Sequence, residues 1–492
     1  MATIWINGVP GQVAVGTRLS DVLSRAPHPC GGKGICGKCR VRATGALSSL
    51  SREEERHLTP FEIADGMRLS CCTIVEGDCR VTVDADSVMA VVVDGKPSAQ
   101  AVSPTFAAYG AAVDIGTTTI AARLYDTTGR LLAQMGCSNP QVAFGADVLS
   151  RVQAAGEGRD LATPLQSAVN ALLTGLAGIA GIAPATIDGV VITGNTAMLC
   201  FISSTDPTPL SRAPFSLPRS FNETVTAASV GLTALPPNRA VYLPPCASAF
   251  IGADALCAAL ACDMDGDRTA LLADMGTNGE MLLAHKGALY ACSTAAGPAF
   301  EGVGISCGMP AVESAIDEVA LVNGRLLSHT IGGGKAKGIC GSGLVDAAAC
   351  LLAIAEMDNG GYLDGKVSLC DGVSLMQEDI RALQQAKAAV SAGLQTLLHH
   401  ADLTADEVEI LYTAGGFGSR LNGRNAATIG LLPRELSARI QPVGNAALDG
   451  ASHLLLDANT RAQMAAMADK TRVIELATDP YFVDRFIQNM SF

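Results

Sequence analysis

The chain has 492 residues, of which 49% are hydrophobic and 16% are charged, and its formal net charge is −13. This length predicts about three domains, and 52 glycines in such a composition indicate a globular, glycine-rich α/β protein with a large core. The net negative charge and the lack of a basic stripe in the sequence argue against a nucleic-acid-binding protein.

The first residues, Met1 to Asn7, lack the basic and apolar regions of a secretory signal peptide. Most of the 16 cysteines stand singly among apolar residues, as buried free thiols do. The most apolar stretch, 171–183, is too short and too rich in glycine to span a membrane. We therefore expect a cytoplasmic protein that makes no membrane contact.

A small sheet with one helix is expected at the start of the chain. Asn7-Gly8 is typical of a tight hairpin turn, and the residues from Thr17 have the pattern of a capped helix. The expected elements are strands over 3–6, 12–15, 38–43 and 80–84 and a helix over 17–23.

A cysteine-rich loop follows this helix. It reads Cys30-Gly-Gly-Lys-Gly-Ile-Cys36-Gly-Lys-Cys39, and Cys71 and Cys72 come later in the chain. The plant-type [2Fe–2S] spacing is C-x4-C-x2-C with a distant fourth cysteine, and the extra residue in the first gap resembles ferredoxins of the adrenodoxin type. Glycines let such a loop wrap tightly and aim backbone N–H groups at the sulfurs. We predict a [2Fe–2S] cluster on Cys30, Cys36, Cys39 and Cys71.

Other interpretations of the loop are weaker. A zinc site usually has paired C-x2-C units, and only Cys36 and Cys39 form one. Arg68-Leu-Ser-Cys71 resembles the Arg-Leu-Ala-Cys of ferredoxins, which favours Cys71 over Cys72 as the fourth ligand. Lys33 and Lys38 either offset cluster charge or are ordinary surface charges. The resemblance to the β-grasp ferredoxin fold covers residues 1–92.

Residues 93–108 lose periodicity and contain proline and serine, which predicts a linker that lets the cluster domain swing.

The next apolar strand ends at Asp114, and Gly116-Thr117-Thr118 turns the chain into another strand. Hydroxyls and N–H groups in such a turn can hold phosphate oxygens, and the aspartate can lie near Mg²⁺.

The same pattern occurs again about 160 residues later, at Asp274-Met-Gly276-Thr277-Asn278-Gly-Glu280. A third strand ends in the glycine turn Gly415-Gly416. We predict catalytic roles for Asp114 and Asp274, while Glu280 either polarises water or is a solvated strand charge. The predicted nucleotide-binding residues are Gly116, Thr117, Thr118, Gly276, Thr277, Asn278, Gly415 and Gly416.

This order of hairpins resembles the ATPase superfamily of actin, sugar kinases and heat-shock chaperones. The resemblance implies a two-lobed, actin-like (ribonuclease H-like) domain over 109–492, with helices after Pro245 and Gly444 that cross closely and could act as a hinge or simply pack tightly. No Walker A motif is present in the sequence. The glycine segments 295–302 and 337–343 are either phosphate-binding helix starts or structural turns. A long amphipathic helix is expected over 379–400.

A ferredoxin domain joined to this ATPase core resembles the reductive activators of corrinoid proteins. The resemblance rests on the motifs at Cys30–Cys39, Asp114–Thr118, Gly145–Arg151, Gly194–Met198, Gly297–Gly302 and Gly338–Gly343. It implies an ATP-hydrolysing enzyme that uses a [2Fe–2S] cluster, ATP and Mg²⁺ to reduce the Co(II) corrinoid of a methyl-transferring protein to Co(I). Its partners would be that corrinoid protein and an electron donor for the cluster. Some members carry an extra domain before the ATPase core, and residues 93–108 leave no room for it.

Alternative functions remain at this point. Activators of other low-potential enzymes share a related ATPase core, but they lack a separate ferredoxin domain. A nucleotide-binding redox sensor and a small-molecule kinase with an appended electron carrier are the alternatives from other classes. The sequence leaves the oligomeric state, including a homodimer, open.

Overall fold

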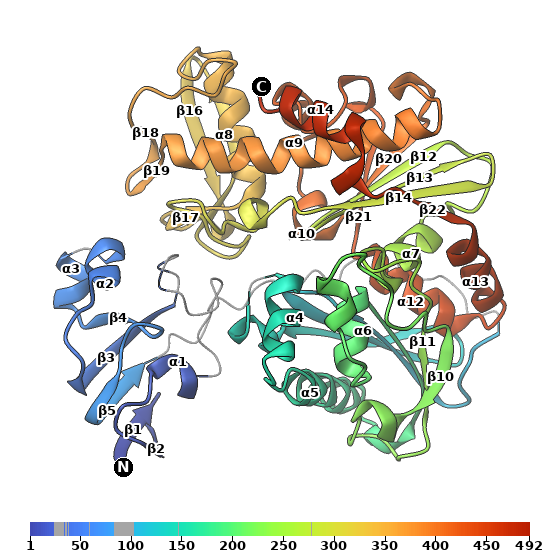
Figure 1. Cartoon of the computed structure of the whole chain (residues 1–492), viewed down its shortest axis with the longest axis horizontal. Coiled ribbons are helices and arrows are strands. Elements are labelled where there is room, and N and C mark those ends of the chain that lie inside the picture. Colours follow the sequence, from blue (N-terminus) through green and yellow to red (C-terminus); the bar gives the residue numbers. More distant parts are fainter. Residues whose placement is uncertain are drawn as a thin grey trace.

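The computed structural model describes residues 1–23, 34, 37, 39–58, 60–82, 103–145, 147–276 and 278–492 (Figure 1). Several sequence predictions fall on positions outside the described residues. These positions are Cys30, Lys33, Cys36, Lys38, Thr277 and the part of the expected linker over 93–102.

The N-terminal domain contains a mixed sheet with strand order β2-β1-β5-β3-β4. Strands β1 and β2 pair around Asn7-Gly8, both of which have positive φ, as the hairpin prediction requires. The expected capped helix is shorter than predicted, and Thr17 does not cap it. The elements are β1 (Ala2–Ile6), β2 (Val9–Val13), α1 (Leu19–Val22), β3 (Arg40–Leu47), α2 (Arg52–His57), α3 (Pro60–Ala64), β4 (Met67–Leu69) and β5 (Val75–Thr82).

The first lobe is built on a sheet with strand order β10-β11-β9-β6-β7-β8. Strands β6, β7 and β8 form antiparallel hairpins, and β9 joins β6 in parallel. The elements are β6 (Tyr109–Ile115), β7 (Thr119–Asp126), β8 (Leu131–Ser138), α4 (Val148–Gly156), α5 (Ala162–Ala180), β9 (Ile187–Gly194), α6 (Thr196–Ile202), β10 (Glu223–Thr226) and β11 (Ala240–Leu243).

The second lobe repeats this arrangement in the order β21-β20-β12-β13-β14-β22. Strands β12, β13 and β14 form the hairpins, and β20 joins β12 in parallel. Its sheet and helices are β12 (Ala270–Met275), β13 (Gly279–His285), β14 (Ala288–Thr294), α8 (Gly341–Ala353), α9 (Gln377–His400), β20 (Ile410–Ala414), α10 (Gly415–Gly418), α11 (Gly423–Thr428), β21 (Ile440–Gly444), β22 (Thr471–Val473) and α14 (Pro480–Gln488).

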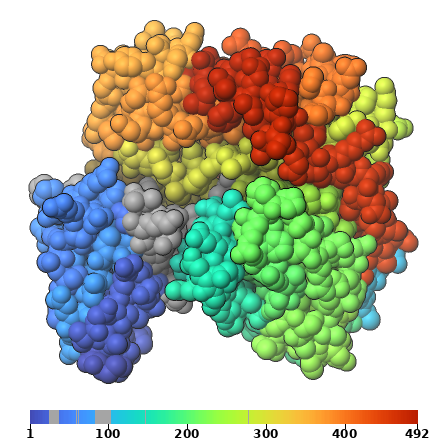
Figure 2. All heavy atoms as spheres, viewed as in Figure 1, coloured from blue at the N-terminus to red at the C-terminus, as the bar shows by residue number. Residues whose placement is uncertain are grey.

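Two smaller sheets extend the second lobe, and α9 confirms the long helix expected over 379–400. Figure 2 shows the surface of residues 130–250, in teal and green, below that of residues 310–400, in yellow and orange. The extra strands are β15 (Ala315–Val322), β16 (Arg325–Thr330), β17 (Gly338–Ile339), β18 (Val367–Cys370) and β19 (Val373–Leu375).

Helices α7 (Ala253–Ala261) and α12 (Ala446–Leu456), followed by α13 (Thr460–Lys470), pack between the two large sheets. Their buried residues form one core with residues from the inner faces of both sheets, such as Ala112 and Leu272. The opposite faces, with Val113 and Leu271, pack against the outer helices. Because both faces are covered, buried apolar residues make up most of the central strands β6 and β9. The expected α/β class with two lobes is therefore confirmed.

The two central helices cross at close range, as their small residues predict. A Cβ built on Gly450 of α12 would collide with the carbonyl oxygen of Cys257 in α7. Arg123 of β7 and Asp449 of α12 also form a buried ion pair of 2.5 Å. The close crossing is therefore confirmed, while a hinge at this place stays a prediction. Among the helices of the described ranges, none is long and apolar enough to cross a membrane.

Candidate functional site

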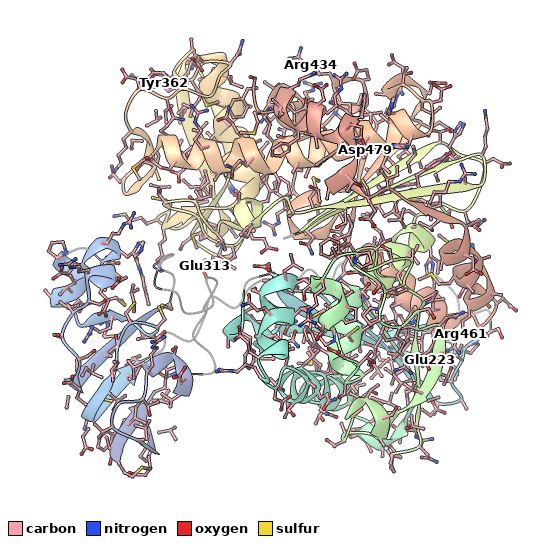
Figure 3. All side chains as sticks on the ribbon, in the orientation of Figure 1. Glu223, Glu313, Tyr362, Arg434, Arg461 and Asp479 are labelled. Carbon is pink, nitrogen blue, oxygen red and sulfur yellow. The ribbon has the colours of Figure 1, made fainter. Side chains whose placement is uncertain are left out.

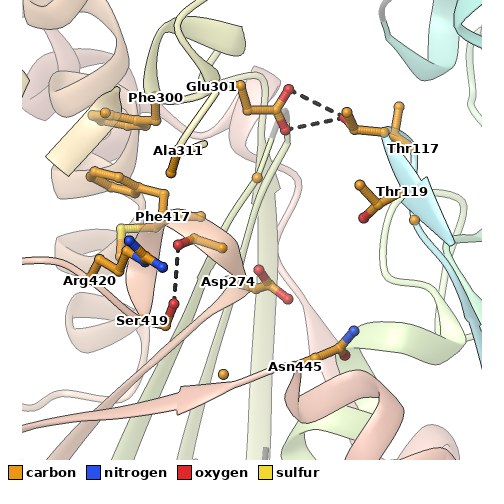
Figure 4. A pocket seen from close by; sticks show the side chains of 18 of the residues that line it. Thr117, Thr119, Asp274, Phe300, Glu301, Ala311, Phe417, Ser419, Arg420 and Asn445 are labelled. Carbon is orange, nitrogen blue, oxygen red and sulfur yellow. Dashed lines mark hydrogen bonds between the residues drawn. The ribbon is translucent and has the colours of Figure 1, made fainter. Parts of the chain in front are cut away.

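The two Asp–Gly–Thr hairpins meet at a cavity of about 660 Å³ that is lined from both lobes (Figure 4). The first hairpin joins β6 to β7, and the second joins β12 to β13. Thr277 lies outside the described residues. The predicted residues that line the cavity are Asp114, Gly116, Thr117, Thr118, Asp274, Gly276, Asn278, Glu280, Gly415 and Gly416.

In both hairpins a glycine N–H closes the turn by donating to a backbone carbonyl, but the first turn is one residue longer, because Ile115 pairs with Ile120 whereas Met275 pairs with Gly279. The N–H of Gly116 donates to the carbonyl oxygen of Thr119 at 2.9 Å, and the N–H of Gly276 donates to that of Asn278 at 3.1 Å. In each hairpin the aspartate stands near the end of the first strand. Asp274 lies directly opposite Glu280 in the strand register, so these two carboxylates reach the cavity from neighbouring strands.

Asparagines from other elements hold the first hairpin. The amide of Asn139 donates to the carbonyl oxygen of Gly116 at 2.8 Å. The amide of Asn195 donates to Oγ1 of Thr117 at 3.1 Å, and the amide of Asn445 donates to Oδ2 of Asp114 at 2.9 Å. These contacts fix the orientation of the predicted phosphate-binding turn.

Sequence reasoning did not assign roles to Asn195 and Asn445. Each caps a helix through its side-chain oxygen, which accepts from Met198 N at 3.0 Å and Leu448 N at 2.8 Å respectively. The side-chain nitrogen of the same amide then donates to the hairpin. An asparagine directly after a glycine and before a helix was the available signal.

Several carboxylates line this cavity, and their pKa values are raised above the ordinary ones. Burial, together with the charge of Asp274, raises the pKa of Asp114 to about 7, and burial raises that of Asp274 to about 6. Burial also raises the pKa of Glu280, with added repulsion from Asp254 and Asp274. Ionised carboxylates this close are stabilised when a cation or a proton joins them.

Asp254 is a further acidic side chain of the cavity that sequence reasoning missed. It stands in the first turn of α7 and accepts a 2.8 Å hydrogen bond from its own helix, from Ala255 N. Burial and the charge of Asp114 raise its pKa to about 7. The chain order of the two helices was recognisable from sequence, but the approach of Asp254 to Asp114 depends on how α7 packs between the sheets.

The late glycine turn also lies at the cavity. Gly415 has a φ of 81°, which glycine adopts without strain. Beside this turn, the rings of Phe417 and Phe300 stack with centroids 4.3 Å apart (Figure 4). The stacked apolar rings suit the aromatic base of a nucleotide, whereas carboxylates suit its phosphates only through a cation that joins the two.

The two glycine segments left open by the sequence both reach the cavity. Phe300 and Glu301 come from the first segment and Gly341 and Ser342 from the second. A Cβ on Gly341 would collide with the carbonyl oxygen of Phe300, so the two segments also pack tightly against each other. They therefore have a structural role beside any contact with a ligand.

In the N-terminal domain, two of the predicted cluster ligands are described. Cys39 and Cys71 are buried, and their Sγ atoms lie 3.2 Å apart. The Sγ of Cys72 lies 3.6 Å from that of Cys71. Hydrogen bonding with Cys71 lowers the pKa of Cys39 to about 6, and the same contact raises the pKa of Cys71. Paired sulfurs in a buried place fit cluster ligation, with Cys30 and Cys36 outside the described residues.

A buried ion pair holds the chain segment that precedes Cys71. Nε of Arg68 lies 2.7 Å from Oε1 of Glu54, and Glu54 also accepts from Leu69 N at 3.1 Å. Glu54 closes the capping box of α2 with Ser51. The Arg-Leu-Ser-Cys motif therefore ties strand β4 to helix α2 directly before the cysteine.

Across the described part of the chain, no group of three or more His, Cys, Asp or Glu side chains is placed to hold a metal ion directly.

Comparison with known families divides the chain as the fold does. A model of the 2Fe-2S iron-sulfur cluster binding domain matches residues 6–76. A model of the RACo middle region matches residues 109–267, which is the first lobe with α7. A model of the C-terminal domain of RACo, the ASKHA domain, matches residues 268–492. The match to the RACo middle region therefore begins directly after the expected linker over 93–108. The domain boundary expected at residue 92 stays a prediction.

The names of individual relatives agree with these family models. The corrinoid activation enzyme RamQ of Eubacterium limosum is 33% identical over 437 residues, which cover 82% of this chain and 72% of that protein. The [Co(II) methylated amine-specific corrinoid protein] reductase of Methanosarcina barkeri is 28% identical over 281 residues, about half of each chain. A solved structure of the reductive activator for corrinoid, iron-sulfur protein has a TM-score of 0.71 and 26% identity, and the match covers 100% of this chain and 98% of that one.

Proposed function

The chain belongs to the family of reductive activators of corrinoid proteins, and from this premise we propose that it uses ATP to move one electron from a [2Fe–2S] cluster to the Co(II) corrinoid of a methyl-transferring protein. The product is Co(I). The observation that carries this proposal is the meeting of both Asp–Gly–Thr hairpins at one cavity, in a chain that also carries a ferredoxin-like domain.

An energy input is required because Co(I) forms only at very low potential. For a one-electron transfer, each 59 mV uphill is a tenfold unfavourable factor. ATP binding or hydrolysis offsets this if it stabilises a conformation in which reduction is more favourable. The cluster supplies the electron, and the cavity between the lobes supplies the coupling.

Within the cavity, the hairpin turns bind the phosphates. Backbone N–H groups and the hydroxyls of Thr117 and Thr118 donate to phosphate oxygens, and Asn195 keeps the Thr117 hydroxyl in place. Asp114 and Asp274 would hold Mg²⁺ through its waters, and the charge of the ion would offset the repulsion between these carboxylates.

The attacking water is oriented by a carboxylate at the same place. Asp274 and Glu280 oppose each other on β12 and β13, so both can face a water beside the phosphate. Burial raises the pKa values of both groups, which makes them better proton acceptors than ordinary carboxylates once ionised.

In the cluster domain, Cys39 and Cys71 provide two thiolates, and Cys30 and Cys36 complete the ligand set. The sulfur of Cys71 lies 3.2 Å from that of Cys39, which supports Cys71 over Cys72. The cluster would accept an electron from a second protein and would pass it to the corrinoid protein.

The proposal is tested by mixing the full chain, with its cluster reduced, with a Co(II) corrinoid protein of a methyltransferase system and Mg·ATP. Cobalt absorbance should shift to that of Co(I). A nucleotide-binding redox sensor would leave the cobalt spectrum unchanged and consume no ATP. A kinase with an appended electron carrier would consume ATP only when a small-molecule acceptor is added, and the cobalt spectrum would again stay unchanged.

A further inference from the structure

Glu301 connects the two lobes through a residue of the proposed nucleotide site. It ends the short helix η5 (Pro298–Glu301) of the second lobe, and Thr118 lies in the first hairpin of the first lobe. The hydroxyl Oγ1 of Thr118 lies 3.3 Å from each carboxylate oxygen of Glu301 (Figure 4). Both side chains line the cavity.

This contact conflicts with phosphate binding. A threonine hydroxyl has one proton, so it can donate to Glu301 or to a phosphate oxygen but not fully to both. A phosphate held by Thr118 would also place its negative charge beside the Glu301 carboxylate, and like charges repel strongly where water is scarce. A bound nucleotide must therefore displace Glu301 from Thr118.

A buried cationic side chain of the first lobe has donor atoms that no described residue uses. Arg151 of α4 is fully buried, and its Nε donates to the carbonyl oxygen of Gly145 at 2.9 Å. Its two terminal nitrogens, Nη1 and Nη2, have no hydrogen-bond partner among the described residues. A buried guanidinium left in this state costs stability, and its planar fork matches a carboxylate in two parallel hydrogen bonds.

Two acidic side chains, Asp147 and Glu301, act on the charge of Arg151. Burial lowers its pKa to about 10, and the charges of Asp147 and Glu301 act against this effect. Asp147 is already engaged as the N-cap of α4, where it accepts from Ser150 N at 2.8 Å. Glu301 is the acid that a nucleotide would displace. Arg151 stands in the motif Gly145–Arg151, for which the proposed function gives no role.

We propose that Glu301 occupies the phosphate contact of Thr118 while the site is empty, and that Arg151 receives the Glu301 carboxylate when a nucleotide phosphate displaces it. This inference rests on the proposed nucleotide site and describes its regulation. Thr118 and Arg151 both belong to the first lobe. When the Glu301 carboxylate moves from Thr118 to Arg151, the second lobe is therefore held at a different point on the first lobe. Occupancy of the site thereby changes the position of one lobe on the other.

The test measures binding of a non-hydrolysable ATP analogue with Mg²⁺ to the 492-residue chain by calorimetry. Glu301→Gln should bind the analogue about three- to tenfold more tightly, because the competing charge is lost. Arg151→Gln should bind it more weakly, because the displaced carboxylate has no receptor. In the Glu301→Gln background, Arg151→Gln should change affinity by less than about twofold, since Arg151 acts only through Glu301.

The matched control is Glu313→Gln, an exposed acid of the same lobe that lies outside the cavity lining (Figure 3). Its affinity should equal that of the wild type. Hydrogen exchange gives a second measurement. Without nucleotide, Glu301→Gln should exchange faster than the wild type at 116–119, and the difference should disappear when the analogue is bound.

Unchanged affinity and unchanged exchange in Glu301→Gln would overturn the proposal. A loss caused by Arg151→Gln that persists in the Glu301→Gln background would show that Arg151 contacts the phosphate itself, which also overturns it. If Arg151→Gln does not fold, Arg151→Lys replaces it, because it keeps the charge without the planar fork, and the same pairwise comparison applies. Absence of nucleotide binding by the wild type would instead overturn the proposed function.

Discussion

The carboxylate of Asp274 lies against Gly415. A Cβ built on Gly415 would be 2.7 Å from Oδ1 of Asp274, and the φ of Gly415 is 81°. The glycine of the third turn thus gives the aspartate of the second hairpin the space it occupies. These two features come from distant parts of the sequence, yet each depends on the other.

Gly415→Ala should therefore displace Asp274 and lower nucleotide hydrolysis by about tenfold or more, with the visible spectrum of the cluster unchanged. The matched control is Gly287→Ala in the turn between β13 and β14. Gly287 has a φ of 74°, and a Cβ built on it would meet no described atom within 4 Å, so it tests backbone strain alone. Equal losses in both variants would assign the effect to strain and not to Asp274.

The fourth cluster ligand is tested by two neighbouring substitutions. Cys71→Ser should abolish or strongly change the visible absorption of the cluster, because Cys71 lies beside Cys39 with 3.2 Å between their sulfurs. Cys72→Ser should leave the spectrum intact. Iron content and absorbance of both purified variants provide the measurement. If Cys72→Ser is the sensitive variant, the assignment of Cys71 is wrong.

The ion pair between Arg123 and Asp449 should matter for stability. Their side chains are 1% and 7% exposed, so Asp449→Ala removes the carboxylate that pairs with a buried guanidinium. We expect a loss of about 3–5 kcal/mol in the free energy of unfolding, measured by denaturant titration. Glu223→Ala breaks the half-exposed pair with Arg219 in the same lobe and should cost about 1 kcal/mol or less. Similar losses in the two variants would contradict this account.

The acidic cavity predicts how stability depends on pH. The pKa is raised to about 7 for Asp114 and to about 6 for Asp274, against roughly 3.9 in an unfolded chain. At these sites the folded protein binds more protons than the unfolded chain from a pH of about 4 to about 7. This contribution to stability is complete below that window and is lost as pH rises through it.

The melting temperature of the nucleotide-free protein should therefore fall as pH rises from about 5 to about 8. Asp114→Asn should reduce this dependence, whereas Asp364→Asn, at an exposed position, should not. Mg²⁺ with an ATP analogue should also reduce it, because the cation stabilises the ionised carboxylates. A melting temperature that is equally pH-dependent in wild type and Asp114→Asn would contradict this explanation.

The sequence predicts those parts of the fold and site that are encoded in short local patterns. A strand followed by Asp and Gly-Thr was sufficient to place Asp114 and Asp274 on two hairpins, and both line one cavity. The turn at Asn7-Gly8 was recognisable for the same reason. In these cases the residues that define the feature are neighbours in the chain.

The features that sequence reasoning missed depend on contacts between distant segments. Asn445 reaches Asp114 only because α12 packs between the sheets, and Asp254 enters the cavity through α7. Thr17 was expected to cap a helix, but its carbonyl accepts from Val75 N at 2.9 Å and the neighbouring Arg18 pairs with Ile74. That pairing keeps the backbone extended at Arg18, so the helix begins later.

The measurement that tests the central claim most directly follows cobalt absorbance after the 492-residue chain, with its cluster reduced, is mixed with a Co(II) corrinoid protein. Co(I) should accumulate with Mg·ATP and should not accumulate without nucleotide. Asp274→Asn, with its cluster spectrum intact, should behave like the wild type without nucleotide. Equal accumulation of Co(I) with and without ATP would contradict the coupling of the lobe cavity to electron transfer.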